Sequence, residues 1–262
     1  MLRAFSTAAT GMTAQQKIVD VISNNLANIN TNGFKRSQID FQDLMYIKLQ
    51  EAGTPVGPGV ETPTGLEIGN GVKAASTTKI FSQGDMENTG RNLDIAIKGD
   101  GFLQVSHPSG KTVYTRDGSL RLDQSGNLTT SSGFRIEPGI TIPADWKQIS
   151  IGRDGTVSVV SGSDPKPQSV GQIQLARFAN PSGLSSMGGN LLSETSASGA
   201  AVTGNAGETG LGTIEQRFLE KSNVQMVTEL VRLIGAQRAY EINSRAIKAG
   251  DEMLNTANRM VN

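Results

Sequence analysis

The chain has 262 residues, in which 24 Lys and Arg balance 24 Asp and Glu, with one His and no Cys. Because net neutrality leaves no strong field around the molecule, composition gives no reason to expect nucleic acid or an anionic membrane as a partner. The lack of Cys excludes disulfides and thiolate metal sites, and no apolar run approaches the roughly 18 residues that suggest a membrane span.

The N-terminal region predicts an α-helix over residues 2–29. This segment contains no proline, and apolar residues recur every seven positions in two rows, as on one stripe of a helix. The rows are Phe5, Met12, Val19 and Leu26, and Ala8, Ile22 and Ile29. The Asn- and Gly-rich residues 30–33 are expected to end the helix. Its first ten residues lack the apolar core of a secretion signal, so no cleavable signal peptide is expected.

Asn24 and Asn25 lie between the stripe positions and are expected to face away from the apolar seam. On an isolated helix they would be solvated amides, which is the reading that the pattern alone favours. The functional alternative is that these amides hydrogen-bond a neighbouring subunit.

Residues 51–71 contain six Gly and three Pro and predict an extended, non-helical segment. Two interpretations stay open, a mobile linker and an ordered insertion that packs against a neighbouring molecule. The residues assigned to such packing are Val56, Pro58, Pro63, Leu66 and Ile68.

The middle of the chain, residues 76–215, predicts one antiparallel β domain. Short apolar segments are separated by turn-forming residues at 99–101, 117–118, 125–127, 154–155 and 165–167. Strands are expected near 93–97, 102–105, 112–115, 120–122, 149–151, 156–160 and 173–178. A surface loop is expected over 199–212, followed by a return connection at 216–221.

The C-terminal region, residues 222–262, predicts a second helix. Its apolar row is spaced by seven throughout and consists of Met226, Leu233, Tyr240, Ile247, Leu254 and Val261. Ser222 and Gln225 suggest a capping box at its start. The companion row expected beside it is mostly polar, so the seam is narrow: Leu230, Gln237, Ser244, Asp251 and Asn258.

These elements predict an α+β fold. Residues 1–33 and 222–262 are expected to pair as a coiled-coil-like inner domain, joined through the extended segment 34–75 to the central antiparallel β domain. Because a narrow seam buries little apolar area, we expect the two ends to stay largely disordered in the monomer. They would fold when neighbouring copies supply further apolar faces.

No motif predicts a catalytic, cofactor or metal site. No segment fits a dinucleotide fingerprint, a phosphate loop or a calcium loop, and the one histidine, His107, precedes Pro108 and is expected in a turn. With one His and no Cys, the chain has too few ligands for a typical zinc site and a single candidate for the histidine of a Ser-His-Asp triad. A glycosidase with two carboxylates is the strongest enzyme alternative, but no pair of acids stands out. We expect a protein that is not an enzyme and needs no cofactor.

Three groups of segments resemble the signatures of the bacterial flagellar rod and hook protein family. The first group is residues 23–28 and 31–36, the second is 94–102 and 114–119, and the third is 222–224 and 237–244. They follow the family's order and cover nearly the whole chain. Within the family, the length and the segment 56–71 resemble the distal rod subunit. The first five residues leave a proximal rod subunit of similar size as an alternative.

The resemblance implies a structural subunit that polymerises into the rigid, hollow, helical drive shaft of the distal rod and transmits torque to the hook. Its implied partners are copies of itself, proximal rod subunits, the hook protein, the surrounding basal-body rings and the flagellar type III export apparatus. The implied location is the periplasmic rod of the basal body. The candidate assembly residues are Phe5, Met12, Val19, Ile22, Leu26 and Ile29 of the N-terminal rows, the C-terminal row from Met226 to Val261, and Asn24 and Asn25. A β-rich module that binds the cell wall, with helical tails, is the alternative from another class.

Overall fold

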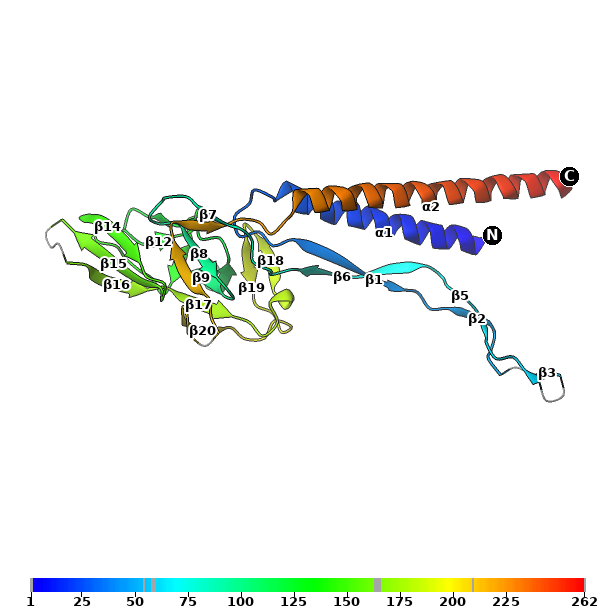
Figure 1. Ribbon diagram of the computed structural model, residues 1–262, viewed down its shortest axis with the longest axis horizontal. Helices are drawn as coiled ribbons and strands as arrows, with labels where there is room; N and C mark the ends of the chain where they lie inside the picture. The colour runs from blue at the N-terminus through cyan, green and yellow to red at the C-terminus, as the bar shows by residue number, and fades with distance from the viewer. Residues whose placement is uncertain (1, 54, 58–59, 163–165, 209, 262) are drawn as a thin grey trace. The chain divides into compact units, whose positions relative to one another are not determined.

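The computed structural model describes residues 2–53, 55–57, 60–162, 166–208 and 210–261. The fold is α+β, as predicted: along the chain, α1 (Leu2–Ala27) comes before all of the strands and α2 (Met226–Val261) follows them (Figure 1). The chain divides into two compact units. Unit 1 comprises Met1–Leu26, Ser37–Thr78 and Gln225–Asn262, and unit 2 comprises Ala27–Arg36 and Lys79–Val224.

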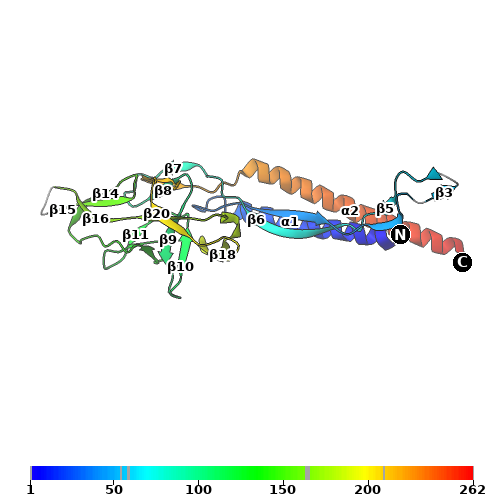
Figure 2. The ribbon, with the colours of Figure 1, turned by 90° about the horizontal axis from the view of Figure 1, so that it is seen from below.

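In unit 1, α1 and α2 run antiparallel and side by side (Figures 1 and 2). The predicted capping box at the start of α2 is wrong. The first helical bond runs from Glu229 N to Gln225 O, whereas the Ser222 hydroxyl accepts a bond from Val224 N at 3.3 Å, before the helix begins. Neither of these helices has the length and hydropathy of a membrane span.

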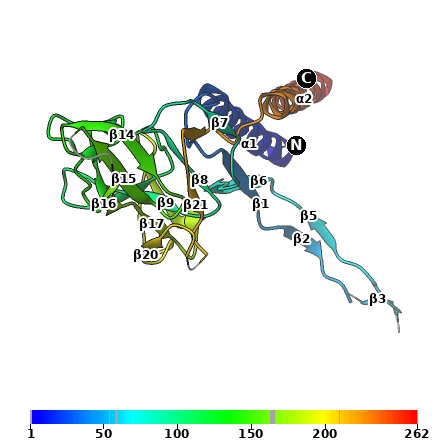
Figure 3. The same cartoon turned by 60° about the vertical axis from the view of Figure 1, so that its left-hand side comes forward.

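The rest of unit 1 is a long antiparallel β-ribbon (Figure 3). Strand β1 (Ser37–Asp43) pairs with β6 (Val72–Lys79), then β2 (Ile47–Gln50) with β5 (Leu66–Ile68), and finally β3 (Pro55–Gly57) with β4 (Val60–Glu61). The ribbon contacts α1 at Val72, whose N–H donates to the Thr10 hydroxyl at 3.4 Å. The segment expected to be extended is therefore a paired hairpin and not a single strand of linker.

Unit 2 is built on a nine-stranded antiparallel sheet with the order β11-β12-β13-β9-β10-β19-β18, while β17 pairs with both β9 and β20. The strands of this sheet are β9 (Phe102–Ser106), β10 (Thr112–Thr115), β11 (Arg121–Leu122), β12 (Leu128–Thr129), β13 (Arg135–Glu137), β17 (Gln174–Arg177), β18 (Ser185–Gly188), β19 (Leu191–Ser193) and β20 (Val202–Asn205). A short 3₁₀-helix, Pro181–Gly183, precedes β18.

Smaller sheets complete unit 2. One is three-stranded and contains β14 (Trp146–Ile151), β15 (Thr156–Ser161) and β16 (Gln168–Gln172). Two antiparallel pairs bring the two sequence ends of the unit together: β7 (Met86–Asn88) with β22 (Phe218–Glu220), and β8 (Ile95–Lys98) with β21 (Thr213–Gln216).

Every predicted strand of the central region overlaps an observed one, and His107 lies in the turn between β9 and β10, where its Nδ1 is 2.8 Å from the Ser109 hydroxyl. Two predictions were wrong. The expected loop over 199–212 contains β20, and the expected return connection over 216–221 contains β22. Both strands are too short to show an alternating pattern, so only their pairing partners reveal them.

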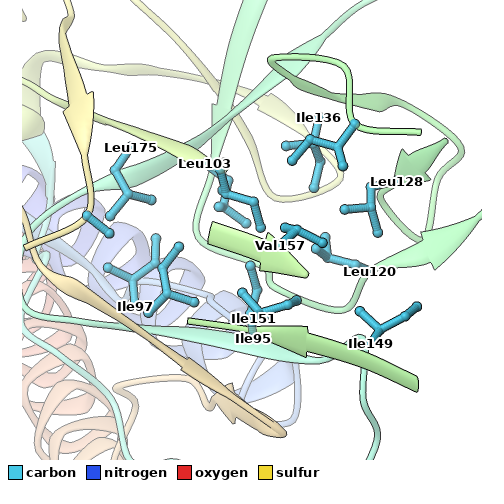
Figure 4. Packing of buried hydrophobic residues seen from close by; sticks show 14 of the residues in the cluster. Ile95, Ile97, Leu103, Leu120, Leu128, Ile136, Ile149, Ile151, Val157 and Leu175 are labelled. Atoms are coloured by element: carbon cyan, nitrogen blue, oxygen red, sulfur yellow. The ribbon is translucent and has the colours of Figure 1, made fainter. Parts of the chain in front are cut away.

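The core of unit 2 is one apolar cluster drawn from many strands (Figure 4). Leu103, Ile136 and Val157 have no exposed surface at its centre, and Ile214 of β21 is equally buried. The cluster therefore includes side chains from both ends of the unit's sequence. A second cluster stacks Phe178 edge-on against Phe102 and Tyr114.

Gly118 tests this packing, because an ideal Cβ there would lie 1.8 Å from Ile95 O. We predict that Gly118→Ala lowers the free energy of unfolding of unit 2 by about 1–3 kcal/mol or more, since the strand backbones must move apart. The measurement is urea denaturation followed by the fluorescence of Trp146, the one tryptophan. Gly139→Ala is the control, because nothing lies within 4 Å of its Cβ. Equal stability of the two variants would contradict the close approach.

Candidate functional site

Unit 2 contains a buried charge cluster centred on Glu220. One carboxylate oxygen, Oε1, lies 2.6 Å from Lys35 Nζ, and the other, Oε2, lies 2.6 Å from Arg116 Nε. The side chains of all three residues are at most 7% exposed. One negative charge therefore faces two positive charges in a place from which water is excluded.

Hydrogen bonds to neutral groups complete the coordination of Glu220 and Lys35. Gly84 N donates to Glu220 Oε1 at 2.9 Å, and Lys35 Nζ donates to Ser82 O at 2.7 Å. In the described parts of the chain, no buried side-chain nitrogen or oxygen lacks a partner. Loss of any charged member would leave the others buried and uncompensated, which is a costly state.

The guanidinium of Arg116 also binds the turn that joins β8 to β9. It donates to the carbonyl oxygens of Ile97 at 3.1 Å and Gly99 at 2.6 Å, and to that of Gly101. Arg116 thus fixes a turn whose Gly99 and Gly101 have φ values of 103° and 141°, where other residues would be strained. The turn reading of residues 99–101 is confirmed, and Arg116 is the reason for its shape.

Opposing effects set the pKa values within the cluster. Burial lowers the pKa of Lys35 below its ordinary value; the charge and hydrogen bond of Glu220 oppose this effect, and the charge of Arg116 adds to it. Burial acts to raise the pKa of Glu220, but the charges of Arg116 and Lys35 and their hydrogen bonds outweigh it and hold that pKa below its ordinary value. Glu220 is therefore ionised at neutral pH.

The backbone closes tightly around the same point. Gly33 adopts a φ of 67° and donates its N–H to Glu220 O at 2.8 Å, and an ideal Cβ there would lie 2.7 Å from the carbonyl carbon of Arg116. Asn223 accepts a bond from Arg36 N at 2.8 Å. Three segments that are far apart in the sequence therefore converge on one site: 33–36, 97–116 and 220–223.

In unit 1, α2 faces α1 through a row of small and polar residues. Asn25 Nδ2 donates to Glu229 Oε2 at 3.3 Å, and both side chains are buried. An ideal Cβ at Gly11 would lie 3.0 Å from Asn243 Nδ2, and an ideal Cβ at Gly250 would lie 2.6 Å from Phe5 Cε1. These three contacts keep one antiparallel register along the helices.

The predicted companion row of α2, from Leu230 to Asn258, is therefore wrong. The row that contacts α1 is Glu229, Ala236, Asn243 and Gly250, one residue before each predicted position. The sequence contains a signal for this row in its helical glycines. A Gly in the interior of a helix lowers helix stability by about 1 kcal/mol relative to Ala, so it usually has a packing reason. Gly250 and Gly11 provide that close approach.

The environment of Asn25 differs from both of the interpretations that the sequence suggests. Its amide is 1% exposed, and besides the bond to Glu229 it donates to Ser37 O at 2.9 Å and accepts from Ser37 N at 2.8 Å. Asn25 thus binds its own chain, and neither solvation nor a contact with a neighbouring subunit applies to it. Asn24 is exposed, and its proposed contact with a neighbour stays a prediction.

The predicted apolar rows differ in how far one chain covers them. Ile22 is buried, whereas Met226 and Tyr240 are exposed. The half-buried members are Phe5, Met12, Val19, Leu26, Ile29, Leu233, Ile247 and Leu254. The side chain of Val261 lies outside the described residues.

A second apolar face of α2 was missed by the sequence reasoning. Val231 and Ile234 lie about 200° around the helix from Glu229 and Ala236 respectively, so the first part of this face points away from α1. Further along, Ile242 lies about 100° from Asn243 and Met253 about 60° from Gly250, so the face turns towards the side of the contact with α1. Its apolar members are between 50% and 77% exposed: Val227, Val231, Ile234, Ile242, Met253 and Met260. We call these six residues the outer stripe. Their spacings of three, four, seven, eight and eleven are the signal that the search for one heptad row overlooked.

A groove of about 380 Å³ lies between α1 and α2. It is lined by Gln16 and Val19 of α1 and by Gln237, Tyr240 and Glu241 of α2. Unit 1 therefore has an exposed apolar stripe and, adjoining it on α2, a groove lined by both polar and apolar side chains.

The β-ribbon exposes apolar side chains as well. Met45 is 86% exposed, and Leu49, Leu66 and Ile68 of β2 and β5 are exposed too. Pro63, another predicted packing residue, is also exposed, whereas Pro58 and the side chain of Val56 lie outside the described residues. In the part of a single chain that the structure describes, no other element buries Met45, Leu49, Leu66 or Ile68.

Comparison with known proteins agrees with this geometry. Three family models match: Flagella basal body rod protein at residues 5–35, Flagellar hook protein FlgE/F/G D1 domain at 96–159, and Flagellar basal body rod FlgEFG protein C-terminal at 215–260. The chain is 47% identical over 262 residues to flagellar basal-body rod protein FlgG of Borreliella burgdorferi, with 99% of each chain covered. The chain belongs to the flagellar basal-body rod protein family.

Other rod-family relatives are similarly complete. The FlgG protein of Caulobacter vibrioides is 46% identical over 260 residues, covering 99% of each chain. The flagellar hook-basal body complex protein FlhP of Bacillus subtilis is 34% identical over 272 residues, covering 98% of this chain and 99% of the relative.

The three matched segments each supply one charged member of the buried cluster. Lys35 comes from the first, Arg116 from the second and Glu220 from the third. The segments that mark this chain as a rod-family protein thus meet at one carboxylate. Among the residues described, no group of three or more His, Cys, Asp or Glu side chains could hold a metal ion.

We predict that Glu220→Gln lowers the free energy of unfolding of unit 2 by about 3–5 kcal/mol, because two buried cations lose their counter-charge. Lys35→Met should destabilise the natural protein but recover part of the loss when added to Glu220→Gln, since it removes an uncompensated charge. Trp146 fluorescence in urea measures all four proteins.

The control is Glu215→Gln, because Glu215 pairs at 3.3 Å with Arg153, whose side chain is 78% exposed. This surface pair should contribute less than about 1 kcal/mol. Additive losses from Glu220→Gln and Lys35→Met would refute the coupling.

Proposed function

We propose that this chain is a structural subunit of the flagellar distal rod, which polymerises into a rigid, hollow, helical drive shaft and transmits torque to the hook. The observation that carries the proposal is the outer stripe of α2, whose apolar side chains are exposed in a single chain. The row of α2 that faces α1 consists of small and polar residues, so the stripe is separate from that contact. Exposed contiguous apolar surface of this kind marks an interaction site. The names of the rod-protein relatives support the place in the basal body.

The stripe and the groove favour a polymer over a closed dimer. If the outer stripe of one copy enters the groove of the next, each copy keeps one free stripe or one free groove for a further copy. Heterologous contacts of this kind generate filaments when the rotation from copy to copy does not close into a ring.

In this proposal residues 1–33 and 222–262 form the inner, coiled-coil-like layer around an export channel. Residues 34–75 link it to the β domain, residues 76–215, which touches its lateral neighbours, and 216–221 lead back to the second helix. The tails become ordered on assembly, when copies cover the outer stripe. The assembly residues are the apolar residues of the N-terminal and C-terminal rows named above and Asn24. The outer stripe is added to them.

The β-ribbon is the proposed stiffening element. Its exposed Leu66 and Ile68 would contact a neighbouring subunit, together with Pro63, Val56 and Pro58. An additional contact between copies removes a sliding motion between them, so the wall of the tube bends less.

The proposed partners are copies of this chain, proximal rod subunits, the hook protein, the basal-body rings and the flagellar type III export apparatus, in the periplasmic rod. No nucleic acid, membrane insertion, cofactor or catalysis is proposed. The rivals are a proximal rod subunit and a β-rich module that binds the cell wall. Truncating both helices separates the classes, because a binding module would keep its ligand whereas a rod subunit would lose polymerisation.

We predict that Ile242→Asp prevents polymer formation, because it places a charge in the apolar contact between copies. Asn255→Asp, at an exposed position about 140° around the same helix from Ile242, is the matched control and should still polymerise. Sedimentation and electron microscopy provide the measurement. Normal polymers of Ile242→Asp, or equal loss in both variants, would contradict the role of the outer stripe.

Deleting residues 47–68 should leave a polymer that bends more. Leu44 N donates to Gly71 O at 2.9 Å, so the deletion joins β1 to β6 through the four residues Met45, Tyr46, Gly69 and Asn70, a common hairpin length. The persistence length in electron micrographs gives the stiffness. Lys48→Gln, which removes only an exposed charge, is the control. An unchanged persistence length after the deletion would argue against a stiffening role.

A further inference from the structure

The fold of unit 2 is completed by a segment near the end of the sequence. Strand β21 pairs with β8, with Ile214 opposite Ile97, and β22 pairs with β7, with Glu220 opposite Met86. Ile214 has no exposed surface and belongs to the main apolar cluster. Apart from an isolated bridge between Asp94 and Ser119, strands β7 and β8 therefore have no other partner strand among the described residues until residues 213–220 are available.

The charges make this dependence stricter than strand pairing alone. Lys35 and Arg116 precede Glu220 by 185 and 104 positions. Both cations are buried in the folded unit, and Glu220 is the carboxylate that each of them contacts. Burying the two cations without it would cost several kcal/mol for each ion.

A partial fold that lacks Glu220 must therefore keep these cations in water. For Arg116 this means giving up its bonds to the carbonyls of Ile97, Gly99 and Gly101, which shape the turn between β8 and β9. For Lys35 it means giving up its bond to Ser82 O, so that the segment around Ser82 moves away from Lys35. The region around β8 and β9 is thus held open by its own charges.

We infer that Glu220 makes the folding of unit 2 contingent on the arrival of residues 213–224. A chain that emerges N-terminus first stays open over its first two hundred residues and closes when its last part arrives. The apolar core and the long-range strand pairs then form together, in one late step. This inference concerns the order of folding and stands independently of the proposed place in the rod.

Pulse-labelling hydrogen exchange of the full-length chain during refolding tests the inference. Amides of β9 and β10 are expected to gain protection in the same kinetic phase as those of β21 and β22. Protection of residues 102–115 in a clearly earlier phase than residues 213–220 would overturn it.

A charge variant separates this mechanism from ordinary cooperativity. In Lys35→Met one of the two opposing cations is gone, so protection of residues 102–115 should precede that of residues 213–220, with a rate about threefold higher or more. The matched control is Lys98→Met, an exposed lysine of β8, which should keep the single late phase. Coincident phases in Lys35→Met would overturn the role of charge. Should that variant fail to fold, the comparison within the natural chain still decides the order.

Discussion

One carboxylate between two cations holds the β-rich unit together. Glu220 is contacted by Lys35 and Arg116 from opposite directions, and the backbone at Gly33 and Gly84 binds the same residue. Apolar packing would by itself tolerate many small rearrangements of the strands. A buried charge does not, because each departure leaves an ion without a partner in a medium that solvates it poorly. Specificity in this unit therefore comes from its polar centre.

The helical unit has the opposite character. Its two helices meet through small and polar side chains such as Ala236, Asn243 and Gly250, while larger apolar side chains of α2 are exposed. A polar residue in such a seam fixes register at some expense of stability. In the proposed polymer, further copies of this rod-family subunit would cover the apolar side chains that one copy leaves exposed.

Local structure could be predicted from the sequence, and long-range pairing could not. The helices, most central strands and the turns at Gly99, Gly126 and Gly155 follow from periodicity and from backbone preferences, which act over a few residues. The partners of Asn25 and Glu220 depend on which distant segments meet, and no spacing encodes that. The strand β22 was missed for the same reason, since three residues carry no period. The outer stripe was predictable in principle, because its spacing is helical.

The β-ribbon has a consequence for how such a protein can diversify. Because Leu44 and Gly71 are bonded across its base, the two ends of the distal segment are neighbours in space. Residues can be gained or lost beyond that point while the helices and the strands at the base keep their register. The distal part of the ribbon can therefore differ in length or sequence between related proteins. Such differences would change the mechanical properties of the assembly without altering the parts that make the subunit fold.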